Sequence, residues 1–502
     1  MTHHDVPALH DITHAHFLGI GGVGVSGIAR IMAARGITVT GTDAKDLPVM
    51  DQLRQRGAKI YVGYAADNIT RAYEETGQTI DVIIASTVAG PENPERQAAE
   101  AAGIPIFHRS QGLAAAMDGK KVLTVAGTHG KTTTSSMAAV AFAHAGFEPT
   151  FAVGAGIANL GTNADHGAGE WFIAEADESD GSLLNYAPDI SIITNIEADH
   201  LDYYGTEAAV HQVFTDFANN IGEDGALIIC ADDAGAAALG QRHRDAATAQ
   251  KPRAKVYTYG LATSMNPVDS GHTHVQSLDL AVTDIQPDVS GTGQQVTYRF
   301  ADGHHQVVSL ATPGTHNALN AAGVLLAAVV AGIPAEDAAA GLAAFTGSAR
   351  RFEYHGTVNE IRVYDDYAHH PTEVTAAITA ANSMAAGNKV HVIFQPHLYS
   401  RTQDFANGFA HALSNASTCR VLDIYQARET PIDGVTAELI TSQLSAELTA
   451  RYPHATQVAT PDQAVTSVVQ AATPGDIILT LGAGDVNQLV DNILTGLTTR
   501  TS

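Results

Sequence analysis

The chain has 502 residues, of which 45% are hydrophobic and 16% charged, so we expect two to four folded domains and little disorder. Its formal net charge of −26 argues against a general nucleic-acid surface, because neutralising phosphates requires clustered Lys and Arg. No apolar run approaches the roughly 18 residues of a membrane-spanning helix, and the polar N-terminal segment lacks a signal-peptide core. With only Cys230 and Cys419, neither a disulfide framework nor a thiolate zinc site is expected. We therefore expect a cytoplasmic protein without nucleic-acid or membrane partners.

One unit recurs three times along the chain: an apolar run, a glycine-rich turn and an alanine-rich helical stretch. The first copy occupies residues 16–36, the second occupies 122–146, and the third begins at Ile477. Alternation of strand, tight turn and helix predicts parallel sheets with crossover helices.

These units predict an α/β protein of three domains. Turn-rich sequence near residues 118–120 and 346–348 suggests that the domains are 1–118, 119–346 and 347–502. Residues 273–300 alternate polar and apolar side chains without a helical pattern, so we expect added β-strands in the middle domain.

The second glycine-rich turn, Gly-Thr-His-Gly-Lys-Thr-Thr at 127–133, has the character of a phosphate-binding loop. Backbone N–H groups at a helix N-terminus favour anions, and glycines allow a phosphate to approach the backbone closely. Lys131 can reach β- and γ-phosphate oxygens, and the Thr132 hydroxyl can ligate Mg²⁺. The strict motif is not met, because Val125 occupies the place of its first glycine. An accidental turn is the alternative, but the preceding strand and following helix favour nucleoside triphosphate binding.

Acidic residues and a histidine follow two further predicted strands, 171–175 and 190–194. Ligand sites of open parallel sheets gather at the carboxyl ends of the strands. Mg²⁺ usually takes one or two carboxylates together with phosphate oxygens, so Glu175 and His200, which lie closest to the strand ends, are the candidate ligands. We interpret the other acids as helix N-caps or solvated turn residues: Asp177, Glu178 and Asp202.

The first glycine-rich turn, Gly19-x-Gly21-x-x-Gly24, has Asp43 nineteen residues beyond its last glycine. Alone, this pattern is typical of an NAD-dependent dehydrogenase, with the acid on the ribose hydroxyls. A lone fingerprint is weak evidence, however, and nothing downstream resembles hydride-transfer machinery. A nonenzymatic nucleotide-sensing or scaffolding protein is a third class, but it would leave the acidic and imidazole clusters without a role.

Two polar clusters close predicted strands in the last domain. The run DDYAHHPTE at 365–373 ends the first strand, and Pro371 suits the start of a helix. The run QPHLYSRT at 395–402 follows the predicted strand 390–394. A single histidine is more often structural, whereas two dense clusters at separate strand ends indicate a site.

These segments together resemble the Mur ligases of peptidoglycan synthesis, and most closely those members that join L-alanine to UDP-N-acetylmuramate. The motif GTHGKTT marks the wider family, which includes folylpolyglutamate synthetases, whereas DDYAHHPTE and QPH with the glycine-rich N-terminal domain select this branch. The resemblance covers nearly the whole chain through GIGGVGVSGIA, GTHGKTTT, EADESD, NIEADHLDYY, PGTHNALNAA, RRFEYHG, DDYAHHPTE, FQPHLYSRT and LGAGD.

The resemblance implies a Rossmann-like N-terminal domain for the UDP-sugar, a central P-loop-type ATPase domain and a Rossmann-like C-terminal domain for the amino acid. ATP would phosphorylate the lactyl carboxylate, and the amine of L-alanine would then attack the acyl phosphate. Two Mg²⁺ sites and a monomer or homodimer are implied. The nearest alternative is the recycling ligase that adds a murein tripeptide to the same UDP-sugar, but the QPH…SRT segment favours a single amino acid.

Matching positions imply the role of each site residue. The implied catalytic residues are Lys131, His200 and Arg350, and Arg350 could bridge to ATP on closure of the third domain. The implied ATP contacts are Gly127, Thr128, His129, Gly130, Lys131, Thr132, Thr133, His316, Asn317, Arg350 and Asp365. The implied metal ligands are Thr132 and Glu175 for one Mg²⁺ and His200 for a second. The implied UDP-sugar contacts are Gly21, Gly22, Val23, Gly24, Asp43, Ser86 and Thr87. The implied L-alanine contacts are Tyr367, His369, His397 and Arg401.

At two places this sequence differs from some members of the family it resembles. Some family members carry an arginine where this chain has Leu398, so one positive contact to the amino acid is missing from the expected pocket. Several other Mur ligases use a carbamylated lysine to support the second metal, but this chain has no lysine between Lys131 and Lys251. That absence agrees with the branch that adds L-alanine.

Overall fold

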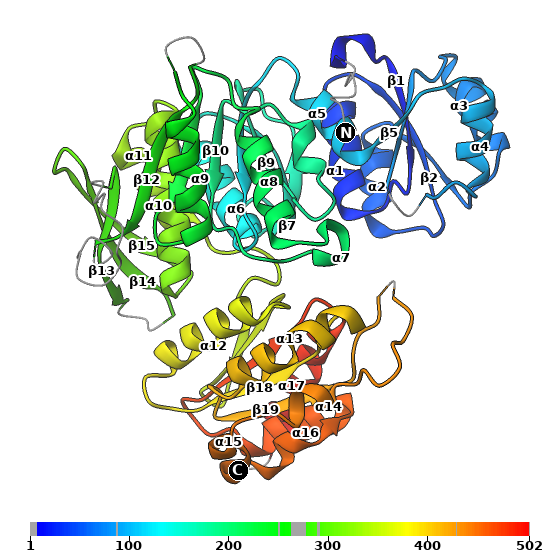
Figure 1. The fold of residues 1–502 in the computed structure, drawn as a ribbon. Coiled ribbons are helices and arrows are strands. Elements are labelled where there is room, and N and C mark those ends of the chain that lie inside the picture. The colour runs from blue at the N-terminus through cyan, green and yellow to red at the C-terminus, as the bar shows by residue number, and fades with distance from the viewer. Residues whose placement is uncertain are drawn as a thin grey trace. The chain divides into compact units, whose positions relative to one another are not determined.

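The computed structural model describes residues 8–86, 89–248, 252–262, 278–288, 292–427 and 429–500 (Figure 1). The architecture is α/β, with parallel sheets in three domains, as the sequence predicts. The chain divides into two compact units, which are described separately below. The first comprises residues 1–283, 297–308 and 319–345, and the second comprises 284–296, 309–318 and 346–502.

The N-terminal sheet has five parallel strands in the order β3-β2-β1-β4-β5. The strand order reverses between β1 and β4, and such a switch point opens a crevice at the carboxyl ends of the strands. The strands are β1 (His14–Leu18), β2 (Thr38–Asp43), β3 (Lys59–Val62), β4 (Val82–Ala85) and β5 (Ile106–His108). The helices are η1 (Leu9–Asp11), α1 (Val23–Ala34), α2 (Pro48–Gln55), α3 (Asp67–Thr76), α4 (Pro94–Ala101) and α5 (Arg109–Met117).

Every residue of β1 is buried, including two histidines, because helices cover both faces of the sheet. Thr40 Oγ1 lies 2.9 Å from His14 Nε2 and 2.8 Å from His16 Nδ1. His16 Nε2 lies 3.1 Å from the wholly buried Glu95 carboxylate, which also accepts from Asn68 at 2.7 Å. These hydrogen bonds satisfy polar groups whose burial would otherwise be costly.

The central sheet has ten strands in the order β15-β14-β13-β12-β11-β10-β6-β9-β7-β8. The expected added strands are present as β13 and β14, followed by β15, although residues 273–277 and 289–291 lie outside the described part of the chain. The strands are β6 (Lys121–Ala126), β7 (Thr150–Ile157), β8 (Thr162–Asp165), β9 (Trp171–Glu175), β10 (Ile190–Ile193), β11 (Ala226–Cys230), β12 (Lys255–Leu261), β13 (Leu280–Pro287), β14 (Gln294–Phe300) and β15 (His305–Leu310). The helices are α6 (Lys131–His144), η2 (Ser182–Asn185), α7 (Leu201–Tyr204), α8 (Glu207–Ala218), α9 (Ala234–Asp245), α10 (Thr315–Val330) and α11 (Ala335–Ala344).

Helix α6, which follows the phosphate loop, is buried from Thr132 to Phe142 because α11 packs against it. Gly341 of α11 makes this close approach possible, since a Cβ there would lie 2.6 Å from the Cα of Ala141. A helix covered on all sides is a rigid base for the loop at its N-terminus.

The C-terminal sheet has six strands in the order β16-β17-β21-β18-β19-β20, and only the β16–β17 pair is antiparallel. One hydrophobic cluster lies under α12 and α13, and another lies under α16 and α17. The strands are β16 (Glu353–Val358), β17 (Ile361–Asp366), β18 (Val390–Phe394), β19 (Thr418–Leu422), β20 (Val458–Ala459) and β21 (Ile477–Leu481). The helices are α12 (Pro371–Ala385), α13 (Tyr399–Leu413), α14 (Glu438–Thr441), α15 (Ala446–Arg451), η4 (Pro453–Thr456), α16 (Pro461–Ala471), η5 (Val486–Gln488) and α17 (Leu489–Thr499).

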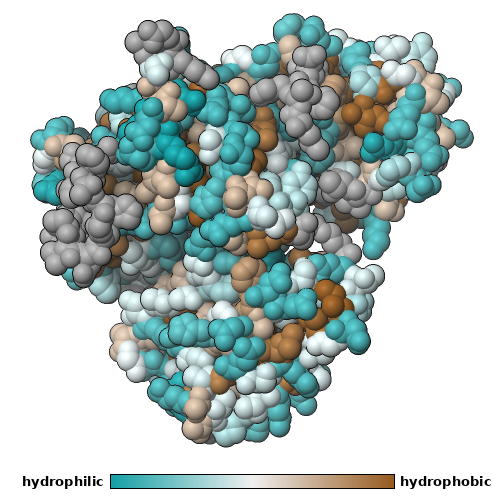
Figure 2. Space-filling view, viewed as in Figure 1, coloured by the Kyte–Doolittle hydropathy of each residue, from teal (hydrophilic) through white to brown (hydrophobic). Residues whose placement is uncertain are grey.

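Hydrophilic residues are spread over the visible surface in Figure 2, and hydrophobic residues appear between them in small groups. Within the described ranges, no helix combines the length and the apolar character needed to cross a membrane.

Candidate active site

The loop at residues 127–130 joins β6 to α6 and is held by the segment that follows β10. The carbonyl of Asn195 accepts from the Thr128 N–H at 3.0 Å, and its side-chain Oδ1 accepts from the His129 N–H at 2.7 Å. The loop is therefore fixed by main-chain and side-chain bonds at the N-terminus of α6, a place where backbone N–H groups favour an anion.

Both glycines of this loop adopt positive φ angles, 132° at Gly127 and 83° at Gly130. A Cβ at Gly127 would lie 2.1 Å from Thr194 Oγ1, and one at Gly130 would lie 3.0 Å from Asn320 Oδ1. The backbone conformation and the close neighbours together explain why this loop needs glycine at both positions.

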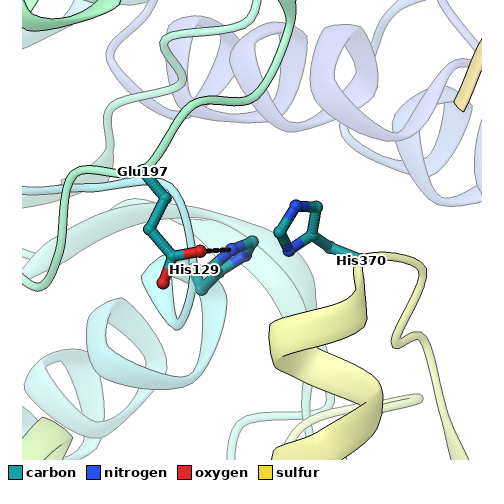
Figure 3. A group of neighbouring side chains, drawn as sticks. All are labelled: His129, Glu197 and His370. Atoms are coloured by element: carbon teal, nitrogen blue, oxygen red, sulfur yellow. Dashed lines mark ion pairs between the residues drawn. The ribbon is translucent and has the colours of Figure 1, made fainter. Parts of the chain in front are cut away.

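Within the loop, His129 lies beside an acid that the sequence analysis did not single out. Its Nε2 is 3.5 Å from Oε2 of Glu197, and Figure 3 shows the ring facing that carboxylate. The Glu197 N–H donates to Thr128 Oγ1 at 2.9 Å, which fixes the acid against the loop. The third side chain in Figure 3, His370, caps α12 by accepting from the Thr372 N–H.

Lys131 is the first residue of α6, and its ammonium is bound by three oxygens. Nζ donates to Oε2 of Glu178 at 2.7 Å, to the Gly127 carbonyl at 2.7 Å and to the Thr128 carbonyl at 3.1 Å. The Lys131 and Glu178 side chains are only 13% and 2% exposed.

The interpretation of Glu178 as a helix cap or solvated turn residue is therefore wrong. The backbone of Glu178 does belong to a turn, because its carbonyl accepts from the Gly181 N–H. Its side chain, however, points into the protein, where a carboxylate is tolerated when a cation pairs with it. Asp177 does behave as a turn residue, because its carboxylate accepts from the N–H and the hydroxyl of Ser179. The side chain of Asp202 lies outside the described part of the chain.

The pKa values of Lys131 and Glu178 are both shifted from their usual values. Burial raises the pKa of Glu178, the Lys131 ammonium opposes this rise, and the Asp177 carboxylate adds to it. Burial lowers the pKa of Lys131, but the Glu178 and Asp177 carboxylates outweigh burial and raise it. Lys131 is consequently a fixed positive charge at neutral pH, as contact with phosphate oxygens requires.

Two of the expected metal ligands lie together beside this cation. Thr132 Oγ1 is 3.1 Å from Oε1 of Glu175, whose Oε2 accepts from the Gly154 N–H at 2.7 Å. Gly154 leaves room there, since a Cβ would lie 2.7 Å from the Glu175 carboxylate and 2.8 Å from Thr132 Oγ1. A hydroxyl and a carboxylate around such a space fit the oxygen ligands that Mg²⁺ prefers.

The third expected metal ligand, His200, precedes α7 in a left-handed conformation with φ 55°. Its Nε2 lies 3.9 Å from Oε1 of Glu178 and 3.7 Å from Oδ2 of Asp199. The His200 imidazole and the Lys131 ammonium therefore lie beside the same carboxylate, that of Glu178.

At the carboxyl end of the N-terminal sheet, the expected UDP-sugar residues gather at one turn. The Gly21 N–H donates to Oδ2 of Asp43 at 2.9 Å, and Gly22 caps α1. Gly19 has φ 76°, and a Cβ there would lie 3.1 Å from Ser86 Oγ. The structure therefore brings Asp43 and Ser86 to the glycine turn that leads into Val23 and Gly24, whereas Thr87 lies outside the described residues.

Tyr64 also faces this turn, because its hydroxyl lies 3.7 Å from where a Cβ of Gly19 would be. Burial raises the pKa of Tyr64, and the Asp43 and Glu95 carboxylates add to the rise. The sequence carried no signal for this residue, since nothing in the stretch between β3 and α3 forms a motif.

In the second unit, the residues expected to bind L-alanine lie along a row of rings. The ring of His369 is 5.3 Å from that of Tyr367 and 6.2 Å from that of His397. His369 Nδ1 is 3.4 Å from the Glu373 carboxylate, and Arg401 on α13 is buried. Burial lowers the pKa of His369 to about 3, opposed by Glu373 and reinforced by the guanidinium of Arg401, so His369 is a neutral imidazole at pH 7.

Leu398, the departure from the family pattern, caps α13 with φ 70°. The N–H groups of Tyr399 and Ser400 at the start of α13 both donate to Oε2 of Glu429, at 2.6 and 3.1 Å. Glu429 was not singled out from the sequence, because it acts on a helix about thirty residues earlier in the chain.

Arg350 and Asp365 form a pair in the second unit. Arg350 Nε donates to Oδ2 of Asp365 at 3.0 Å, and its two terminal nitrogens donate to the carbonyls of Gly482 and Gly484. Asp365 is wholly buried and also accepts from Thr480 Oγ1 at 2.6 Å. These bonds fix both side chains at the carboxyl ends of β17 and β21.

Two further expected ATP contacts stand at the start of α10. Asn317 Nδ2 donates to the Pro313 carbonyl at 2.8 Å, which closes the first turn. Burial lowers the pKa of His316 to about 4, so this imidazole is neutral at pH 7, with one ring nitrogen as a hydrogen-bond donor and the other as an acceptor.

Comparison with known proteins places three parts of the chain in one family. Three family models match in chain order: "Mur ligase family, catalytic domain" over residues 14–121, "Mur ligase middle domain" over 125–328, and "Mur ligase, glutamate ligase domain" over 350–484. The UDP-N-acetylmuramate–L-alanine ligase of Paenarthrobacter aurescens is 49% identical over 481 residues, which cover 96% of each chain. That of Mycobacterium avium is 43% identical over 513 residues, covering 100% of this chain and 98% of the other.

Solved structures give the same result for the fold. The UDP-N-acetylmuramate–alanine ligase of Thermotoga maritima has a TM-score of 0.71 at 24% identity, covering 96% of this chain and 98% of the other. A murein peptide ligase from Psychrobacter arcticus has a TM-score of 0.65 at 25% identity, covering 98% of this chain and all of the other. From the three family models and the full-length relatives, the chain belongs to the Mur ligase family.

Proposed function

We propose that this Mur ligase joins L-alanine to the lactyl carboxylate of UDP-N-acetylmuramate at the expense of ATP, an early cytoplasmic step of peptidoglycan synthesis. The observation that carries the proposal is the arrangement at the start of α6, where Lys131 adjoins the Thr132–Glu175 pair. The full-length relatives at 43–49% identity, which bear the name of this activity, support the same reading.

The reaction has two steps, and each makes a demand on the protein. A lactyl carboxylate oxygen attacks the γ-phosphorus of ATP, the bond to the β,γ-bridging oxygen breaks, and ADP leaves. The nitrogen of L-alanine then attacks the acyl carbon and loses a proton, and phosphate departs as the amide forms. Lys131 and the N–H groups of the loop at 127–130 would stabilise the charge on the transferring phosphoryl group.

The central domain, which we place at residues 119–346, would bind ATP with Mg²⁺. Thr132 and Glu175 would hold one ion, and His200 with a neighbouring carboxylate would serve a second. Bound Mg²⁺ would neutralise the phosphate oxygens of ATP. The protein's own contribution is to fix these ligands, as the bond from the Gly154 N–H fixes Glu175.

The flanking domains, placed at residues 1–118 and 347–502, would bind the two other substrates. The glycine turn would receive the UDP diphosphate, and Arg401 would pair with the carboxylate of L-alanine. His369, with its pKa near 3, is too weak a base to deprotonate an ammonium group at neutral pH, so we assign it to orienting the amino acid.

The test is phosphate release from ATP in the presence of UDP-N-acetylmuramate and a panel of L-alanine, glycine, L-serine and the murein tripeptide. We expect release to depend on UDP-N-acetylmuramate and to be fastest with L-alanine. The recycling activity is the second candidate, supported by the likeness to the murein peptide ligase of Psychrobacter arcticus. A preference for the tripeptide would select that activity and reject ours.

A further inference from the structure

Arg109 is a cation that stands between the glycine turn and the acidic loop after β9. It is the first residue of α5, and its side chain is 31% exposed. A Cβ at Gly24 would lie 3.8 Å from one terminal nitrogen of Arg109. The other terminal nitrogen lies 3.8 Å from Oδ2 of Asp177 and 3.9 Å from Oδ2 of Asp180.

Within the described part of the chain, the guanidinium of Arg109 has only long ion pairs with the protein. Across the described ranges its side chain makes no hydrogen bond, and the two carboxylates beside it lie beyond hydrogen-bonding distance. An arginine offers five N–H donors in a fixed fork, and these remain available to a ligand. A positive charge at a helix N-terminus also opposes the helix dipole, so the stability of α5 does not explain this residue.

The backbone that carries Arg109 is, in contrast, firmly held. Ser110 is buried, and its hydroxyl lies 2.8 Å from His108 Nδ1 and accepts from Asn185 Nδ2 at 2.9 Å. Helix α5 packs against α1, which begins at the glycine turn, and against η2, which follows the acidic loop. The cation is therefore presented from a fixed base to the space beside the turn.

The neighbouring histidine does not share this charge. Burial lowers the pKa of His108, the Asp180 carboxylate opposes the shift, and the charge of Arg109 adds to it. The imidazole is therefore neutral at pH 7, which leaves Arg109 as the cation that borders the glycine turn on this side.

We propose that Arg109 is a substrate-binding residue that contacts the diphosphate of the nucleotide-sugar held on the glycine turn at residues 21–24. This rests on the proposed function and deepens it by adding a residue to the sugar-binding domain. The N-terminus of α1 attracts an anion from one side. The forked guanidinium meets it from the other side, and planar forks bind phosphate oxygens in pairs.

The test compares Arg109→Ala and Arg109→Lys in the full-length protein, with UDP as the probe in isothermal titration calorimetry. We expect the dissociation constant of UDP to rise about 10- to 100-fold in Arg109→Ala, as for loss of hydrogen bonds to a charged group, and less in Arg109→Lys. In steady-state assays the KM for UDP-N-acetylmuramate should rise, while kcat and the KM for ATP change less than about twofold. Arg71→Ala is the matched control, because Arg71 is an exposed arginine of the same domain that pairs with Glu75.

Other outcomes are equally decisive. Failure of the wild-type protein to bind UDP would reject the proposed function itself, whatever the variants do. Equal UDP affinity in wild type and Arg109→Ala would reject the role of Arg109 alone. A loss of kcat at unchanged UDP affinity would place Arg109 at the reacting end of the substrate and also overturn the assignment.

A further variant separates ligand binding from a structural role. Asp180→Asn removes one of the long ion pairs and leaves the guanidinium in place, so UDP should bind at least as tightly as to wild type. Weakening as large as that of Arg109→Ala would mean that Arg109 acts by holding the acidic loop, and the proposal would be wrong.

Discussion

Nζ of Lys131 lies 2.7 Å from Oε2 of Glu178, so the cation of the phosphate loop is held by a buried carboxylate 47 residues further along the chain. The same nitrogen donates to two carbonyls of its own loop. A phosphate oxygen that binds Lys131 must therefore replace one of these three oxygens. The ammonium that it contacts is already fixed in position by the others.

Lys131→Ala should abolish amide formation while leaving the binding of UDP-N-acetylmuramate nearly unchanged. The reason is that Lys131 belongs to the loop of the central sheet, whereas the glycine turn belongs to the N-terminal sheet. We expect phosphate release to fall at least ~10³-fold, as for other cations that stabilise a transferring phosphoryl group. Calorimetry with UDP-N-acetylmuramate is the control, and an equal loss of sugar binding would contradict the separation of the two sites.

Arg401→Ala should raise the KM for L-alanine without comparable effects on the other substrates. The loss of a charge-assisted pair with the substrate carboxylate corresponds to about 10- to 100-fold in KM. Phosphate release measured against L-alanine concentration tests this, with the KM for ATP as internal reference. A parallel rise in every KM would show that Arg401 supports the fold of the second unit instead.

Arg350→Ala should lower the stability of the second unit as well as the activity. Removing the guanidinium leaves the wholly buried Asp365 without its cation, a change that costs ~3–5 kcal/mol when a buried pair is broken. Calorimetric unfolding of Arg350→Ala and of the double variant with Asp365→Asn should show the loss and its partial recovery. If Arg350→Ala unfolds like wild type but is inactive, the guanidinium acts on ligand and is not needed to hold Asp365.

Glu95→Gln should flatten the acid side of the stability profile. Burial raises the pKa of Glu95, but hydrogen bonds from His16 and Asn68 outweigh it and hold the pKa below its usual value of 4.5. A lowered folded pKa means that the stabilisation is complete above about pH 4.5 and is lost as the pH falls through the folded value. Thermal unfolding between about pH 3 and 7 should show this loss in wild type.

In Glu95→Gln the unfolding free energy at neutral pH should fall by about 1–3 kcal/mol, and its acid slope should be shallower. Glu100→Gln on the same helix is the control, because Glu100 is a surface residue paired with Arg96 and its change should stay within about 0.5 kcal/mol. An unchanged acid slope in Glu95→Gln would mean that other carboxylates dominate the profile.

Strand positions and the proximity of Thr132 to Glu175 could be predicted from sequence. The predicted strands at 171–175 and 390–394 match β9 and β18 residue for residue, because strands buried on both faces read as continuous apolar runs with sharp ends. Thr132 and Glu175 could be placed together because the carboxyl ends of neighbouring parallel strands share one edge.

What could not be predicted depends on pairing between distant segments. Glu178 looks like a turn residue in sequence, and only the fold reveals the cation that allows its burial. Glu429 and Arg109 belong to no recognisable motif, since each acts on a turn or helix contributed by another part of the chain. Local sequence patterns indicate which residues end a strand. They do not indicate which charged side chain from another segment will pair with those residues.

The β7–β8 hairpin contacts the start of α1 in the N-terminal domain and also the Glu175 carboxylate of the central domain. Asn163 Nδ2 donates to the Val23 carbonyl at the start of α1, while the Gly154 N–H holds Glu175. Arg56 pairs with Asp165 at 3.1 Å across the same junction. A chimaera that exchanges the N-terminal domain between relatives should therefore keep the hairpin with its own α1, because a mismatched pair would shift the glycine turn at residues 21–24 relative to the loop at 127–130.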